Sequence, residues 1–270
     1  MRIAASLAAA ALTGALLTLA QAQSSKPAPA KPAPTKPQTQ APQPPPVAPV
    51  KPYKAVAVRL PKPLDDASFD AFRKQLYDIV QKKDRAGLAK VVVAKDFFWE
   101  VESGDKADKK KSGIDNLAAA VNLGAKDGSG WEILGSYAAD PTAQPLPDKQ
   151  GVVCSPADPD FDDKELEEVA KATETDPGEW GYPMAEGVEV RAEAKPKSEV
   201  TEKLGMHFVR VLPEMPPPAS PNDIPMIKIV TPAGKTGFVP GDKLSPLGND
   251  QLCFVKDAAG WKVAGFIGGE

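Results

Sequence analysis

The sequence predicts an α+β protein built from two different parts and a C-terminal β-hairpin. Apolar residues recur at three- and four-residue steps over residues 67–82, which predicts the first helix of a helical α+β unit spanning 64–180. Short β-branched runs separated by glycine and proline turns predict a small β-barrel over 181–247. Two apolar runs within 248–270 flank Ala258-Ala259-Gly260, a pattern typical of a hairpin. Because an isolated hairpin is marginally stable, we expect it to pack back on the first unit.

The N-terminus has the pattern of a secretory signal peptide. Arg2 supplies a positive charge, residues 3–20 are apolar and uncharged, and Ala20-Gln21-Ala22 fits the cleavage rule. We therefore expect residues 1–22 to be removed and the mature protein to be periplasmic or secreted. The alternative is a retained anchor, since the apolar run of about 18 residues is at the lower limit for crossing a bilayer. No later stretch is apolar enough to span, so we expect no membrane span in the mature protein.

Residues 23–63 are dominated by proline, alanine, lysine and glutamine, which predicts a disordered, extended linker. The first 63 residues contain eight basic residues and no acid. Residues 64–270 therefore hold 25 of the 33 basic residues and all 36 acids, a formal charge of −11. The basic linker is either a solubilising spacer or a segment attracted to an anionic envelope surface. The acidic remainder argues against nucleic acid as a partner.

Within the helical unit, the sequence predicts several further elements. Asp84 is placed to cap a second helix, residues 95–101 read as a strand or buried edge, and helices are expected at 115–123 and near 131–137. Residues 151–154 predict a short buried strand. The alternating acids from Asp158 to Asp163 lack the glycine and glutamate of a calcium-binding loop, so Asp162 is interpreted as a helix N-cap. We expect no metal and no cofactor.

Strands are expected at 187–191, 206–212, 226–230 and 237–239. In this order and spacing, residues 181–247 resemble the bacterial SH3 domain. VEVRAEA (188–194) is similar to the opening strand of that family, FVRVL to its second strand, and IKIVTPAGKTGFV to a strand, a glycine turn and a Gly-aromatic-Val strand. Met226 stands where the family often has tryptophan, and the proline-rich insert 212–225 lengthens a neighbouring loop.

The resemblance implies that this exported protein binds a cell-wall peptide or a protein partner in the envelope. The candidate contact surface is Trp180, Tyr182, Arg191 and Phe238. The alternative for Trp180 and Tyr182 is packing at the hinge before the barrel.

Cys154 and Cys253 are the only cysteines. An even count in an exported protein favours a disulfide bond between them, which would connect the hairpin to the strand at 151–154 and make the barrel an insertion. The alternative is two buried thiols.

We expect a non-catalytic binding protein. The single histidine, His207, lies within a predicted strand, which disfavours histidine-dependent catalysis and zinc sites. Gly234-Lys235-Thr236 lacks the earlier glycine of a phosphate loop. Two alternatives stay open: a periplasmic protein–protein scaffold without wall binding, and a cell-wall hydrolase that uses paired carboxylates.

Overall fold

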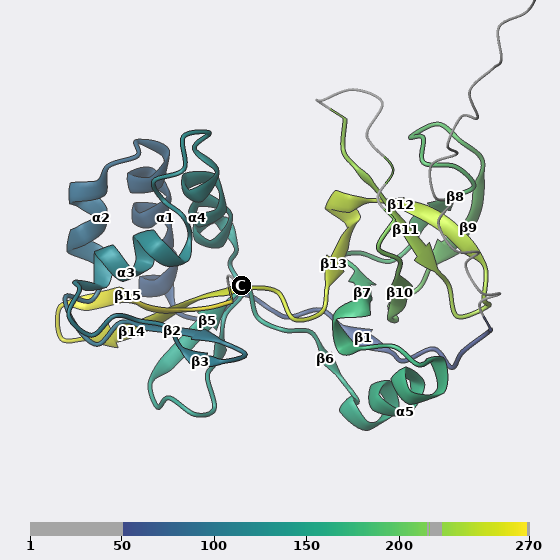
Figure 1. Ribbon diagram of the computed structural model, residues 1–270, viewed down its shortest axis with the longest axis horizontal. Coiled ribbons are helices and arrows are strands. Elements are labelled where there is room, and N and C mark those ends of the chain that lie inside the picture. Colours follow the sequence, from purple (N-terminus) through teal and green to yellow (C-terminus); the bar gives the residue numbers. More distant parts are fainter. Residues whose placement is uncertain (1–50, 215, 217–222, 269–270) are drawn as a thin grey trace, which may run out of the picture. The chain divides into compact units, whose positions relative to one another are not determined.

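The computed structural model describes residues 51–214, 216 and 223–268 (Figure 1). The predicted signal peptide and residues 23–50 of the predicted linker lie outside this range. The described residues form a mixed α+β fold and belong to one compact unit. Its helices are α1 (Ala67–Gln81), α2 (Arg85–Val91), α3 (Gly113–Ala120), α4 (Ser129–Ala139) and α5 (Asp163–Thr173), with short 3₁₀ turns η1 (Pro177–Glu179) and η2 (Gly241–Lys243).

Helices α1, α2, α3 and α5 begin where an aspartate or serine side chain accepts hydrogen bonds from the first backbone N–H groups, whereas α4 begins after Gly128 without a side-chain cap. Asp66 caps α1, and Asp84 and Asp162 cap α2 and α5 as predicted. The apolar stripe predicted for 67–82 is the buried face of α1, formed by Phe69, Phe72, Leu76 and Val80.

A six-stranded sheet supports these helices. Helices α1 to α4 cover one face of it (Figure 1), and Leu252, Phe254 and Phe266 of the sheet share their apolar core. Gly265 of β15 lies opposite Phe98 of β2, where a Cβ atom would clash with the phenyl ring. The strands, in the order β3-β2-β15-β14-β5-β4, are Gly104–Asp105, Phe98–Val101, Gly260–Ile267, Gln251–Asp257, Val152–Ser155 and Gln144–Pro145.

The predicted C-terminal hairpin is the centre of this sheet. β14 and β15 pair with each other, β14 also pairs antiparallel with β5, and β15 pairs parallel with β2. The hairpin therefore packs back on the first helical unit, as expected. A second region, from β6 to β13, is inserted in the chain between β5 and β14.

The second region contains a seven-stranded antiparallel sheet, with order β13-β7-β10-β11-β12-β8-β9. Among the described residues it does not close into the predicted barrel, because the outer strands β13 and β9 do not pair with each other. A single residue pair, Phe238 with Arg191, connects β12 to β8. The strands are β7 (Trp180–Pro183), β8 (Val188–Arg191), β9 (Val200–Leu204), β10 (Val209–Val211), β11 (Met226–Val230), β12 (Thr236–Pro240) and β13 (Leu244–Pro246).

Residues 51–63, part of the predicted linker, pack into the fold. Val56 and Val58 are buried, and the Tyr53 hydroxyl donates to the Val230 carbonyl at 2.8 Å. β1 (Val58–Arg59) pairs with β6 (Asp160–Phe161). The larger apolar and aromatic side chains in this segment gain stability by being buried, and the preceding Lys-Pro-Ala repeats have no such side chains.

Cys154 and Cys253 form the predicted disulfide bond. The two residues lie directly opposite each other on β5 and β14, and both are buried. The bond covalently joins the strands before and after the inserted region. Among the described residues, none of the helices combines the length and apolar character needed to cross a membrane.

Candidate functional site

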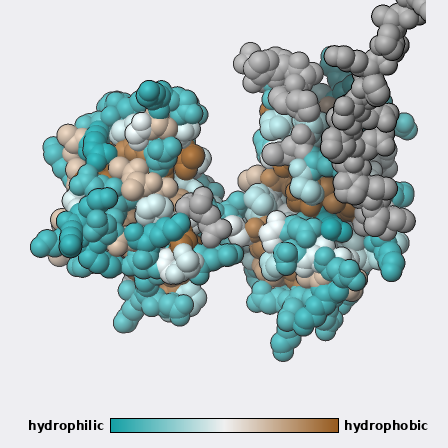
Figure 2. Space-filling view, viewed as in Figure 1, coloured by the Kyte–Doolittle hydropathy of each residue, from teal (hydrophilic) through white to brown (hydrophobic). Residues whose placement is uncertain are grey.

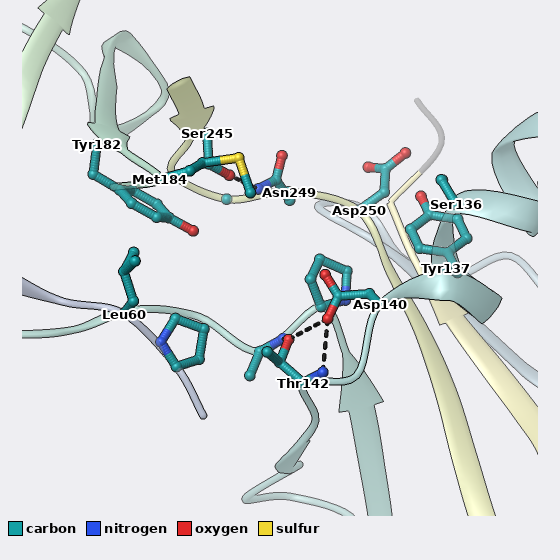
Figure 3. A pocket seen from close by; sticks show the side chains of 14 residues that line it. Leu60, Ser136, Tyr137, Asp140, Thr142, Tyr182, Met184, Ser245, Asn249 and Asp250 are labelled. Carbon is teal, nitrogen blue, oxygen red and sulfur yellow. Dashed lines mark hydrogen bonds between the residues drawn. The ribbon is translucent and has the colours of Figure 1, made fainter. Parts of the chain in front are cut away.

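A cleft of about 620 Å³ is formed by five parts of the chain. These are the segment before α1, the end of α4 with the turn after it, the segment Pro156-Ala157 after β5, β7 with the residue that follows it, and the region from β13 to the start of β14. Figure 3 shows the polar side chains that face this space. Its apolar lining includes Leu60, Pro61 and Met184; Leu60 and Met184 are exposed.

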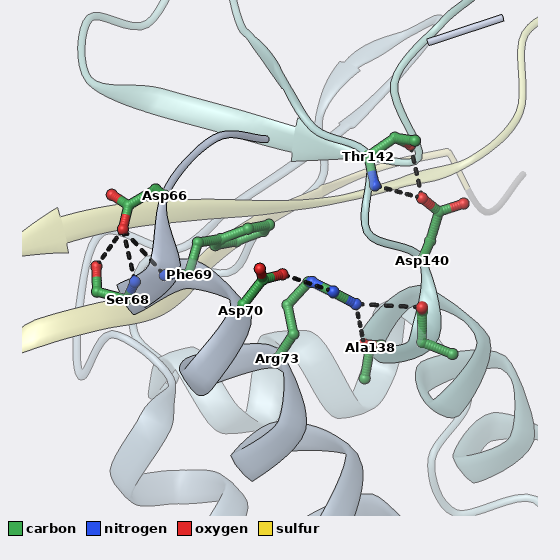
Figure 4. A network of polar contacts seen from close by, with 9 residues as sticks. Asp66, Ser68, Phe69, Asp70, Arg73, Ala138, Asp140 and Thr142 are labelled. Carbon is green, nitrogen blue, oxygen red and sulfur yellow. Dashed lines mark hydrogen bonds and ion pairs between the residues drawn. The ribbon is translucent and has the colours of Figure 1, made fainter. Parts of the chain in front are cut away.

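The C-terminal end of α4 is fixed by a buried arginine (Figure 4). The Arg73 side chain, which is only 10% exposed, donates through Nη1 to the carbonyl oxygens of Ala138 and Ala139, both at 3.1 Å. Its Nη2 donates to Asp70 at 2.9 Å. The last carbonyls of a helix have no partner within the helix, so the guanidinium supplies one and also favours the negative end of the helix dipole.

Replacing Arg73 with methionine should lower the free energy of unfolding by about 2–3 kcal/mol, because it removes charged hydrogen bonds and leaves the carbonyl oxygen of the buried Ala138 without its guanidinium partner. Chemical denaturation followed by circular dichroism measures the change. Lys74→Met is the matched control, since Lys74 is exposed on the same helix. Equal effects of the two substitutions would contradict the role assigned to Arg73.

Asp140 directly follows α4 and carries a carboxylate into the cleft. Its Oδ1 accepts hydrogen bonds from the Thr142 backbone N–H at 2.7 Å and from the Thr142 hydroxyl at 2.6 Å. The Thr142 hydroxyl in turn accepts from the Ala157 N–H at 2.9 Å. These bonds hold one carboxylate oxygen of Asp140 in place, while no described residue donates a hydrogen bond to the other oxygen, Oδ2.

Two tyrosines bring phenol groups to the same cleft. Tyr182 on β7 and Tyr137 on α4 are both buried, and Figure 3 shows the Tyr182 hydroxyl directed into the cleft. Burial raises the pKa of Tyr182, the hydrogen bond with Ser245 opposes the rise, and the carboxylates of Asp158 and Asp140 add to it. Burial, followed by the Asp250 carboxylate, raises the pKa of Tyr137. Both phenols therefore stay protonated and can donate hydrogen bonds.

The charge of the lining has one sign. Asp140 and Asp250 both line the cleft, whereas none of the fourteen lining residues is a lysine, arginine or histidine. Two carboxylates, phenol donors and an apolar wall are a suitable combination for a ligand with a positively charged group next to an apolar part.

The structure separates the four residues predicted to form the contact surface. Tyr182 lines the cleft. Trp180, on the same strand, is fully buried, and its indole N–H donates to Thr175 at 3.0 Å. This agrees with the alternative of packing that the sequence left open for Trp180. Arg191 and Phe238 are half-buried partners on β8 and β12 and do not line the cleft.

His207 lies beside Ala57 in an isolated bridge, and its Nε2 atom is buried without a hydrogen-bond partner among the described residues. Burial lowers its pKa, so the imidazole is neutral near pH 7. Within the described part of the chain, no group of three or more His, Cys, Asp or Glu side chains is placed to hold a metal ion.

Sequence reasoning did not identify Tyr137, Asp140, Ser245 or Asp250 as site residues. The local signal at Asp140-Pro141 is that of a helix end followed by a turn. Nothing in the sequence indicates that this turn lies beside β7 and β13. Only the tertiary structure brings these segments together.

The fold and this cleft define a mixed α+β protein with an acidic cleft lined by tyrosines. Comparison of the chain with models of protein families, with curated proteins and with solved structures found no match.

Proposed function

We propose that this chain is an exported, non-catalytic binding protein of the cell envelope, and that its cleft holds a positively charged group of a cell-wall peptide or of a protein partner. The observation that carries the proposal is the lining of the cleft, with two aspartates and no basic residue. A cell-wall peptide with free amino groups has the complementary charge. The carboxylate oxygen Asp140 Oδ2 would accept from the ammonium group, and the apolar wall would contact the attached carbon chain.

Two further features support export. The N-terminal pattern is that of a signal peptide, and the buried Cys154–Cys253 disulfide bond is typical of oxidising compartments such as the periplasm. We also propose that residues 181–247 form an SH3-like module. The antiparallel sheet formed largely by these residues supports this part of the proposal.

Purified peptidoglycan should retain the mature protein at low salt, and acetylation of the free amino groups of the peptidoglycan should abolish retention. Asp140→Asn should weaken binding at least tenfold, because it removes the charge while its side-chain oxygen can still accept from Thr142. Sedimentation of the protein with peptidoglycan over a concentration series measures both effects.

Asp78→Asn is the matched control, since Asp78 is an exposed aspartate on α1 outside the cleft. Absence of retention at low salt would rule out wall binding, and crosslinking in intact cells would then test the scaffold alternative. If neither acetylation nor Asp140→Asn weakens retention, the cleft is not the binding site for the cell wall. Release of soluble wall fragments would instead favour a hydrolase that uses the carboxylates.

A further inference from the structure

A second groove lies along helix α5, and none of its lining residues belongs to the cleft described above. Its volume is about 470 Å³. The apolar floor consists of Phe161, Leu166, Ala170 and Leu247, of which Leu166 and Ala170 are buried in the protein. Most of the surface visible in Figure 2 is polar, with apolar areas in small patches, so an apolar groove is a candidate contact surface.

The rim of this groove is acidic. Asp163, Glu167, Glu174 and Asp176 line it, and Lys171 is the basic residue among its lining residues. The Lys171 ammonium lies 2.8 Å from Glu167 and so offsets one of the four negative charges. The groove therefore combines an apolar floor with an excess of negative charge, and this favours an occupant with apolar and basic residues.

The opposite flank of α5 contacts a segment of the chain that itself combines apolar and basic residues. Lys51, Pro52, Tyr53 and Lys54 line a hollow there, and the Lys54 ammonium lies 2.8 Å from Glu165 of the helix. Glu174, at the end of α5, lines both this hollow and the groove. One side of the helix thus binds a lysine–proline segment of the chain, and the other side presents a similar combination of apolar and acidic groups.

We propose that the α5 groove docks an extended segment of a partner protein in which proline or another apolar residue lies between lysines. An extended proline-containing segment makes no internal hydrogen bonds and presents its rings to an apolar surface at little cost in conformational entropy. The flanking lysines then reach the carboxylates on the rim. This docking site is independent of the cleft and of the ligand proposed for it.

A fluorescently labelled peptide, Ac-Lys-Pro-Leu-Pro-Lys-amide, is a direct probe of this groove. Fluorescence anisotropy with the mature protein at low ionic strength should show saturable binding, and the same peptide with glutamate in place of lysine should not bind. The double variant Asp163→Asn, Glu167→Gln should weaken binding about tenfold, because it removes two rim charges without touching the floor. Ala170→Leu, which fills the floor, should weaken binding while leaving the charge unchanged.

Glu168→Gln is the matched control, since Glu168 lines the hollow on the opposite flank of α5 and does not line the groove. It should leave the affinity of the probe within twofold of the original value. Circular dichroism of each variant should match that of the original protein. Absence of saturable binding, equal binding of the glutamate peptide, or equal losses in Glu168→Gln and the double variant would each overturn the proposal.

Discussion

Replacing Cys154 and Cys253 together with alanine should lower the free energy of unfolding by about 4–5 kcal/mol in the chain-entropy model of disulfide stabilisation. The two cysteines are 99 residues apart, so the bond restricts a long loop in the unfolded chain. It also lies between β5 and β14, which enclose the inserted region in the sequence. Without the bond, β5 and β14 are held to each other by their strand pairing and side-chain packing alone, while the inserted region keeps its peptide connections to both strands.

Denaturant unfolding followed by circular dichroism measures the effect, and the original protein under reducing conditions should unfold at a similarly lowered midpoint. Ser155→Ala is the control in the same strand. Ser155 is fully buried and its hydroxyl has no hydrogen-bond partner among the described residues, so the substitution should be neutral or slightly stabilising. A double alanine variant as stable as the original protein would show that the disulfide bond does not stabilise the fold.

Replacing Trp180 with alanine should lower the free energy of unfolding by about 3–5 kcal/mol, the usual cost of creating a large cavity in a core. The indole is fully buried, packs edge-to-face against Tyr53 with ring centroids 5.1 Å apart, and donates to Thr175. Because Tyr53 contacts Trp180 and anchors residues 51–63 on the fold, the variant should also expose that segment to proteases. Denaturant unfolding and limited proteolysis measure the two effects.

Phe238→Ala is the informative comparison for Trp180. Both residues were candidates for the contact surface, but Phe238 is only half-buried on β12. Its replacement with alanine should therefore lower the free energy of unfolding by about 1 kcal/mol or less. A loss of ligand binding in the Trp180 variant that accompanies unfolding would reflect stability alone. A Trp180 variant with unchanged stability and reduced binding would contradict the structural role and restore Trp180 as a contact residue.

Local patterns in the sequence predicted most of the helices, because capping and apolar periodicity depend on neighbouring residues. The stripe from Phe69 to Val80 and the caps Asp84 and Asp162 are examples. The weakest predictions concerned short strands. β4, β6 and β13 contain only two or three residues, which is too few for an alternating pattern to be recognised.

The candidate site could be predicted only in part. Tyr182 was identified from the sequence and lines the cleft, whereas Tyr137 and Asp140 were not identified. The side chains of Trp180 and Tyr182 are two positions apart, so both point to the same side of β7, yet only Tyr182 lines the cleft. Trp180 is enclosed in an apolar cluster that includes Tyr53, Val56 and Leu166, and no local pattern encodes these contacts between segments far apart in the chain.

The sequence by itself determined the mixed α+β class and the helix boundaries near their caps, and it predicted the pairing of the two cysteines and the return of the C-terminal hairpin to the helical unit, which the structure confirms. The tertiary structure alone decided that residues 51–63 belong to the fold, that the seven-stranded sheet stays open among the described residues, and that Asp140 and Tyr182 share a cleft. The physical reason is the range of the interactions. Caps and apolar periodicity act within a few residues, whereas sheet closure, burial and cleft formation depend on contacts between segments far apart in the chain.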